Sequence, residues 1–156
     1  SVLMTGSLVA VAASFGWGAL TDRLGPRRVM TMVLATWCAG LGLAAAAPSA
    51  GVFWLGGPLV GAGLGGIWVA GRTLLIQLVP ADRLGEFLGL YGLTEKSAAV
   101  LGPLVWALIV DHLFAGWGPV RYRIAVVSLL GFVVLGMWVL RKVPQPGRPA
   151  AGAVTA

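Results

Sequence analysis

Apolar residues run through this chain in five long stretches, which are separated by short polar or charged breaks. The stretches cover residues 1–20, 29–47, 52–78, 87–110 and 122–140. A helix that crosses the hydrocarbon of a bilayer needs about 20 mainly apolar residues, and each stretch meets or approaches that length. The pattern predicts an all-α integral membrane protein with a five-helix bundle over residues 1–143. A polar, proline-rich tail at 144–156 is expected to be disordered.

Composition agrees with this prediction and narrows the function. Hydrophobic residues make up 58% of the chain and charged residues 10%, whereas a soluble domain carries about 25% charged residues. The net charge is +6, but the arginines interrupt apolar runs instead of forming a basic face, so nucleic acid is not an expected partner. Cys38 is alone and offers neither a disulfide framework nor a metal site. We expect no cofactor and, without a catalytic constellation in the sequence, no enzyme activity.

Glycines in the third stretch predict close helix packing. Gly57, Gly61 and Gly65 recur at intervals of four residues, which places small residues on one face of a membrane helix and permits a tight crossing. Residues 61–66 also spell a dinucleotide-binding fingerprint, but that fingerprint requires a preceding strand and a βαβ unit. Within a long apolar run, the packing interpretation is preferred.

The first polar break, residues 18–28, combines helix-ending residues with positive charge. Gly25 and Pro26 interrupt a helix, and Asp22 is expected to end the first span. If the five spans alternate in direction, the basic residues divide unequally between the two sides: Arg23, Arg27, Arg28, Arg83, Arg141, Lys142 and Arg148 on one, Arg121 and Arg123 on the other. Because basic loops remain in the cytoplasm, the break and the C-terminus are predicted to be cytoplasmic.

Charged residues also occur deep within two of the predicted spans. Arg72 lies in the third span, and the pair Glu95 and Lys96 lies in the fourth. A charge within a bilayer costs about 2.5–3.5 kcal/mol even on the most lenient scale, so such residues usually face a partner or a watery cavity. Positions 72 and 95 are equally distant from the turn between the two spans. We therefore predict that Arg72 and Glu95 approach to salt-bridge or water-bridged distance.

Other residues near these charges have both a functional and a structural interpretation. Lys96 is rotated about 100° from the preceding residue of its helix, so it contacts either an anionic group of a solute or a structural partner. Tyr91 and Gln77 are either solute contacts or polar links between helices. Gly102 and Pro103 should bend the fourth span, because proline removes a backbone hydrogen bond, and they form a candidate hinge.

The first break resembles the signature loop of the major facilitator superfamily of secondary transporters. The residues that match its pattern are Gly18, Leu20, Asp22, Arg23, Gly25, Arg27 and Arg28. Residues 65–103 are similar to bacterial facilitators related to the yeast vacuolar amino-acid effluxers of autophagy. The superfamily has twelve helices in two halves, of which helices 2–6 and helices 8–12 would read alike. The short proline-rich tail after the last span and the similarity over residues 65–103 favour the equivalents of helices 8–12 for this chain. It would then be a C-terminal half without its first helix.

The resemblance also implies a mechanism and a set of partners. The two halves would rock about a site at the midplane and give alternating access to a small solute such as an amino acid. Arg72 would line or adjoin the cavity, and Asp22 would meet a helix N-terminus of the other half as part of a gate. The expected partners are the solute, the lipid bilayer, the missing N-terminal half and, where transport is coupled, protons. The expected location is a bacterial inner membrane.

Two other functions remain open from the sequence. One is a proton-coupled antiporter that exports drugs or metabolites. The other is a truncated remnant or a membrane scaffold that transports nothing.

Overall fold

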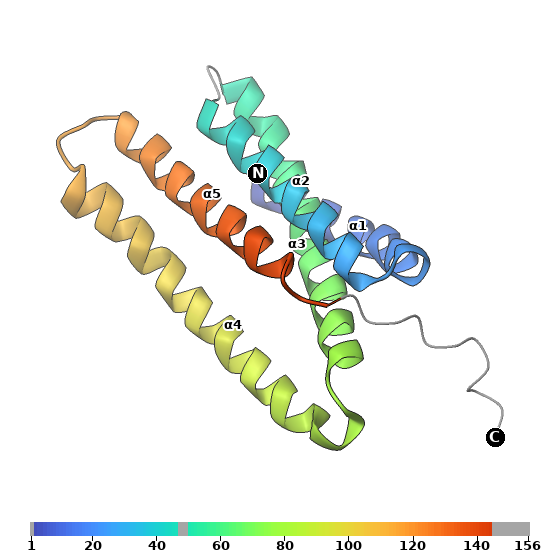
Figure 1. Ribbon diagram of the computed structural model, residues 1–156. Coiled ribbons are helices and arrows are strands. Elements are labelled where there is room, and N and C mark those ends of the chain that lie inside the picture. Colours follow the sequence, from blue (N-terminus) through green and yellow to red (C-terminus); the bar gives the residue numbers. More distant parts are fainter. Residues whose placement is uncertain (1, 47–49, 145–156) are drawn as a thin grey trace, which may run out of the picture.

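The fold is entirely helical over the residues that the computed structural model describes, 2–46 and 50–144 (Figure 1). The helices are α1 (Val2–Leu24), α2 (Pro26–Ala46), α3 (Ala50–Leu78), α4 (Leu84–Ala107) and α5 (Val120–Leu140). A short 3₁₀ turn, η1 (Ala81–Arg83), precedes α4, and a π-helical segment, η2 (Leu108–Leu113), extends it. The predicted fold class is confirmed. Of the tail expected at 144–156, only Pro144 is among the described residues. Ser1 and Ala47, which end two of the predicted spans, also lie outside the described residues.

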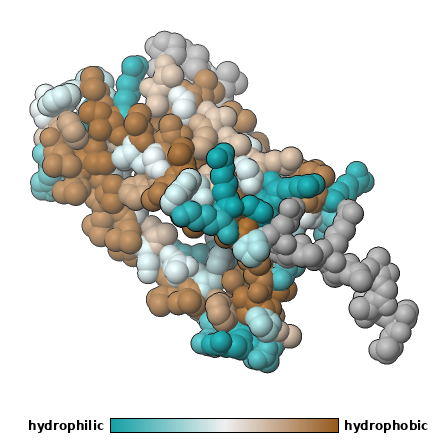
Figure 2. All heavy atoms as spheres, in the orientation of Figure 1, coloured by the Kyte–Doolittle hydropathy of each residue, from teal (hydrophilic) through white to brown (hydrophobic). Residues whose placement is uncertain are grey.

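The described part of the chain contains four segments that are long and apolar enough to cross a membrane. They are Pro26–Ala46, Gly56–Leu78, Ala81–Leu113 and Val120–Leu140. The helix α1 has 23 residues and is not among those four. Large apolar side chains are exposed on several helices, including Phe15 on α1, Leu104 on α4 and Phe132 on α5. In Figure 2, apolar residues cover much of the face in view, as expected of a protein surrounded by lipid.

A single glycine separates α1 from α2. Gly25 has a φ of 86°, which side chains disfavour, and its N–H donates to the Thr21 carbonyl at 3.0 Å. Pro26 is the first residue of α2, a position at which its missing N–H is not needed. The expectation that Asp22 ends the first span is wrong, because α1 continues to Leu24. Aspartate does not prevent a helical backbone, and the reversal occurs only at Gly25.

The helix α3 packs closely against both α1 and α2. A side chain at Gly65 would collide with the carbonyl oxygen of Ala10, so α1 and α3 meet backbone to backbone. The indole N–H of Trp17 on α1 donates to the carbonyl of Ala62 on α3 at 2.8 Å. Val29 and Val33 of α2 are fully buried with Ala70 of α3. The packing predicted for the glycine-rich face is thus confirmed at Gly65.

By contrast, α4 joins the other helices mainly near its two ends, and none of its described residues is buried. At one end Tyr91 reaches Gly71 of α3. At the other, Ile109 and Val110 of η2 pack with Ala125 of α5. Figure 1 shows α4 running apart from α1 and α2. The helix is not interrupted at Pro103, and the role of Gly102 and Pro103 as a hinge stays a prediction.

The contact between α1 and α3 gives a test of the fold. We expect Gly65→Ala to destabilise the full-length protein, because its methyl group would force the two backbones apart; overpacking costs about 1–3 kcal/mol. The matched control is Gly42→Ala on α2, where no atom lies within 4 Å of the added carbon. Thermal unfolding in detergent is the measurement. An unchanged melting temperature for Gly65→Ala would contradict the close crossing.

Candidate functional site

The polar residues predicted within the spans meet where α3 and α4 face each other. Tyr91 of α4 extends across to α3, and its hydroxyl lies over Gly71, where an added methyl group would be 2.8 Å from the hydroxyl oxygen. The methyl end of Met30 on α2 lies beside the same glycine, 3.4 Å from that position. The absence of a side chain at Gly71 therefore makes room for the tyrosine hydroxyl. Tyr91 is half-buried there, with its polar end at the interface of three helices.

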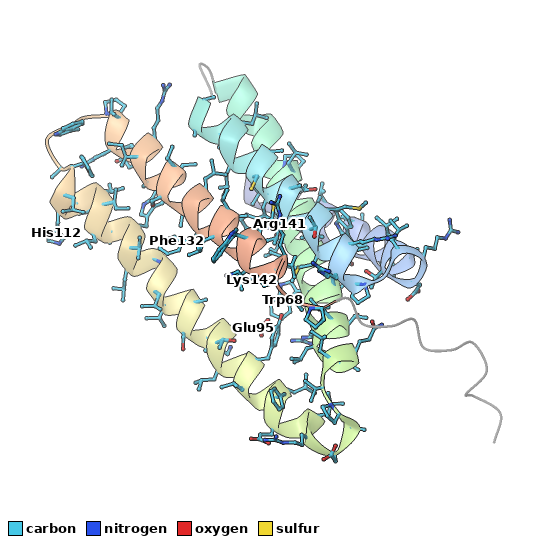
Figure 3. All side chains as sticks on the ribbon, in the orientation of Figure 1. Trp68, Glu95, His112, Phe132, Arg141 and Lys142 are labelled. Carbon is cyan, nitrogen blue, oxygen red and sulfur yellow. The ribbon has the colours of Figure 1, made fainter. Side chains whose placement is uncertain are left out.

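Charges of opposite sign act on the Tyr91 hydroxyl from the two helices. Glu95 is one turn further along α4 and interacts electrostatically with the hydroxyl, as does Arg72 of α3. Figure 3 shows Glu95 on the side of α4 that faces α3 and α5. We call Arg72, Tyr91 and Glu95 the polar triad. Its members come from two helices and lie within the spanning segments Gly56–Leu78 and Ala81–Leu113.

Arg72 and Glu95 do not form the direct ion pair that was one form of the predicted approach, and the water-bridged form stays a prediction. The two side chains do not come within the 4.0 Å of a salt bridge. The prediction assumed that α3 and α4 form a tight hairpin, but Tyr91 occupies the space between them. In addition, the guanidinium of Arg72 lies over the ring of Trp68, 5.0 Å from its centroid. Both charges nevertheless interact electrostatically with the same hydroxyl, so they share one region of the protein, in which Arg72 is exposed and Glu95 is half-buried.

Two other predicted residues stand outside the polar triad. Lys96 and Gln77 are both exposed. Neither takes part in the hydrogen bonds, ion pairs or ring contacts that the structure shows for its described residues. A role for either in contacting a solute stays a prediction. His, Cys, Asp and Glu do not gather in groups of three or more within the described residues, so this part of the chain offers no cluster of metal ligands.

The residues of the charged break gather at a different place, at one end of the bundle. Gly18 is half-buried on α1, and Asp22 and Arg23 are exposed in its last turn. Arg28 is exposed at the start of α2. The neighbouring Arg27 donates from Nη2 to the backbone carbonyl of Arg141 at 2.8 Å, which connects the start of α2 to the end of α5.

Two residues of the site were missed from the sequence. Trp68 precedes Arg72 by four residues, and this spacing puts both side chains on the same helix face. The spacing was therefore a usable signal for the contact between the ring and the guanidinium. Gly71 gave no such signal, because its importance depends on Tyr91, which lies twenty residues later in the sequence.

The comparisons with known proteins agree on one family. The sequence matches the model of the Major Facilitator Superfamily over residues 1–155. The uncharacterized MFS-type transporter YxiO of Bacillus subtilis is 33% identical over 93 residues, which are 60% of this chain and 20% of that protein. Multidrug resistance protein MdtG of Escherichia fergusonii is 36% identical over 129 residues, 80% of this chain and 30% of that protein.

A shorter match is to a protein linked by name to autophagy, as are the effluxers that residues 65–103 resemble. Autophagy-related protein 22 of Kluyveromyces lactis is 39% identical over 51 residues, 33% of this chain and 10% of that protein. Since relatives of several kinds match, this similarity supports the superfamily and not a particular branch. No solved structure matches the chain significantly. The chain spans 20% of the length of YxiO.

A double-mutant cycle tests the contact between Tyr91 and Gly71. We expect Gly71→Ala to lower the melting temperature of the full-length protein, because the new methyl group displaces the hydroxyl. Tyr91→Phe removes that hydroxyl, so Gly71→Ala should be less harmful in its presence. Residues in contact show coupling energies of about 0.5–3 kcal/mol. Strictly additive effects would mean that the two residues do not touch.

Proposed function

Since the chain belongs to the major facilitator superfamily, we propose that it is the C-terminal part of a larger secondary transporter that moves a small solute by alternating access. The region between α3 and α4 contributes to its solute site. The chain spans 20% of the length of YxiO, and the superfamily has twelve helices in two halves, so the proposed transporter has an N-terminal half against which this bundle rocks.

The polar triad is the observation that carries this proposal. Arg72 and Glu95 bring opposite charges into spanning segments, where charges are costly and usually face a partner or a watery cavity. They do not neutralise each other in a direct pair. Tyr91 offers a hydroxyl that both donates and accepts hydrogen bonds. A solute with polar groups would therefore find a cation, an anion and a hydroxyl in one region.

An amino acid is the first candidate solute. Its carboxylate suits Arg72, because a guanidinium donates two parallel hydrogen bonds to a carboxylate. Its ammonium group suits Glu95. A purely structural role would be better served by a direct ion pair, because the pair would reduce the cost of both charges without needing a ligand.

A drug-like solute is the second candidate. The relative MdtG is named a multidrug resistance protein, and the ring of Trp68, which is 48% exposed beside Arg72, offers an apolar surface. On this alternative, export would be coupled to protons, and the Glu95 carboxylate would be the proton-binding group. A solute panel distinguishes the two candidates.

We also propose an orientation for the bundle. The turn between α1 and α2, the turn between α3 and α4, and the end of α5 carry the excess of basic residues and face the cytoplasm. The membrane is a bacterial inner membrane. Asp22, exposed at the end of α1, meets a helix N-terminus of the other half, where the helix dipole favours a carboxylate, and so acts as part of a gate.

Transport by the full-length protein in proteoliposomes tests the proposal. A panel of amino acids and cationic drugs is offered with and without a pH gradient. We expect Arg72→Gln and Glu95→Gln each to lower uptake or efflux of the accepted solute by about tenfold or more, because each loses a hydrogen bond to a charged group.

The controls are Arg83→Gln and Glu86→Gln. These residues form an exposed ion pair of 3.0 Å in the turn between α3 and α4, so their loss should leave transport within about twofold, since exposed pairs contribute little. Equal losses in the triad and control variants would contradict the proposed site. Full transport by Arg72→Gln and Glu95→Gln would contradict it as well.

A further inference from the structure

The start of α2 and the end of α5 form a composite basic surface. Arg27 and Arg141 are 114 residues apart in the sequence, yet the guanidinium of Arg27 donates to the backbone carbonyl of Arg141 at 2.8 Å. This contact brings Arg28, Arg141 and Lys142 to the same end of the bundle, and all three residues are exposed. We call Arg27, Arg28, Arg141 and Lys142 the basic surface. Figure 2 shows hydrophilic residues gathered around this end of α5.

The first turn of α2 lacks the negative charge that would suit it. The N-terminus of a helix is a centre of partial positive charge that favours anions, and its first N–H groups have no partner within the helix. The first turn of α2 nevertheless contains Arg27 and Arg28 and no acidic residue. In the last turn of α1, Asp22 and Arg23 offset each other in charge. The C-termini of α1 and α5 lie at the same end and offset the dipole of α2, so the positive charge here comes from the arginine and lysine side chains, which an anion would neutralise.

Aromatic and apolar side chains border the basic surface on the membrane side. The ammonium group of Lys142 lies 3.7 Å from the centroid of the Trp138 ring. Trp138 is 53% exposed, and Leu135 and Val139 of the same helix are also exposed. Tryptophan at the end of a membrane span is typical of the headgroup level. Cationic groups thus adjoin a surface that suits acyl chains.

From this arrangement we propose that the basic surface binds the phosphate group of an anionic phospholipid. Arg28, Arg141 and Lys142 contact the phosphate, while Trp138 and Leu135 contact the glycerol and the first acyl carbons. Arg27 positions the site by holding the end of α5 against the start of α2. The apolar border favours a lipid over free phosphate, because a soluble anion gains nothing from Trp138 or Leu135.

Native mass spectrometry of the full-length protein tests this proposal. The protein in detergent is titrated with phosphatidylglycerol, with phosphatidylcholine of the same chains, and with inorganic phosphate. We expect phosphatidylglycerol to bind more tightly than phosphatidylcholine. Removing one cationic side chain, in Arg28→Gln or Lys142→Gln, should weaken that preference about fivefold, since a basic residue near an anionic surface contributes about that factor.

The matched control is Arg83→Gln, which removes a cation from the turn between α3 and α4, outside the basic surface. It should leave the lipid preference within about twofold. Lys142→Arg keeps the positive charge and should also keep the lipid preference. If it does, the loss seen in Lys142→Gln is due to the missing charge and not to a folding defect. If Arg83→Gln weakened the preference for phosphatidylglycerol as much as Arg28→Gln does, the proposal would be overturned. The preference would then come from the overall positive charge of the protein and not from the basic surface. Displacement of the lipid by millimolar inorganic phosphate would likewise exclude a lipid site.

Discussion

Direct contact between the backbones of α1 and α3 fixes the geometry on which the rest of the bundle depends. In lipid, apolar side chains gain little by leaving their surroundings, so helices associate through close van der Waals packing and hydrogen bonds. Gly65 permits this approach to Ala10, and the Trp17 indole adds a hydrogen bond to the Ala62 carbonyl. The helix α2 also packs on α3, through Val29, Val33 and Ala70. These contacts hold α3 in place, and α3 carries Gly71 and Arg72.

The helix α4 completes the site without being packed along its length. Its contacts lie near its ends, at Tyr91 against Gly71 and through η2 against α5. Between those ends, α4 exposes apolar side chains such as Leu101 and Leu104. The polar triad lies where Tyr91 of α4 meets Gly71 of α3.

The sequence predicted the helices well, since runs of about 20 apolar residues separated by charged or glycine-containing breaks have few alternatives in a membrane. It also predicted the close packing at Gly65 from a spacing of four. It did not predict where α1 ends, because the conformation of Gly25, and not the polarity of Asp22, decides that position. It brought Arg72 and Glu95 to one region but did not distinguish a water-bridged approach from a direct ion pair, which the described residues do not form. Their separation depends on how far α4 diverges from α3 and on Tyr91 filling the gap, and neither follows from local sequence.

Reactivity of single cysteines along α4 tests most directly whether its α3-facing side lines a watery path. In full-length protein whose native cysteines, including Cys38, have been replaced, a cysteine is placed at Ala99, one turn from Glu95, or at Leu104 on the opposite face. Both proteins are treated in membranes with a charged thiol reagent. We expect rapid labelling at position 99, slowed by a transported solute, and little labelling at position 104. Equal reactivity at both positions, or labelling at 104 alone, would contradict this expectation.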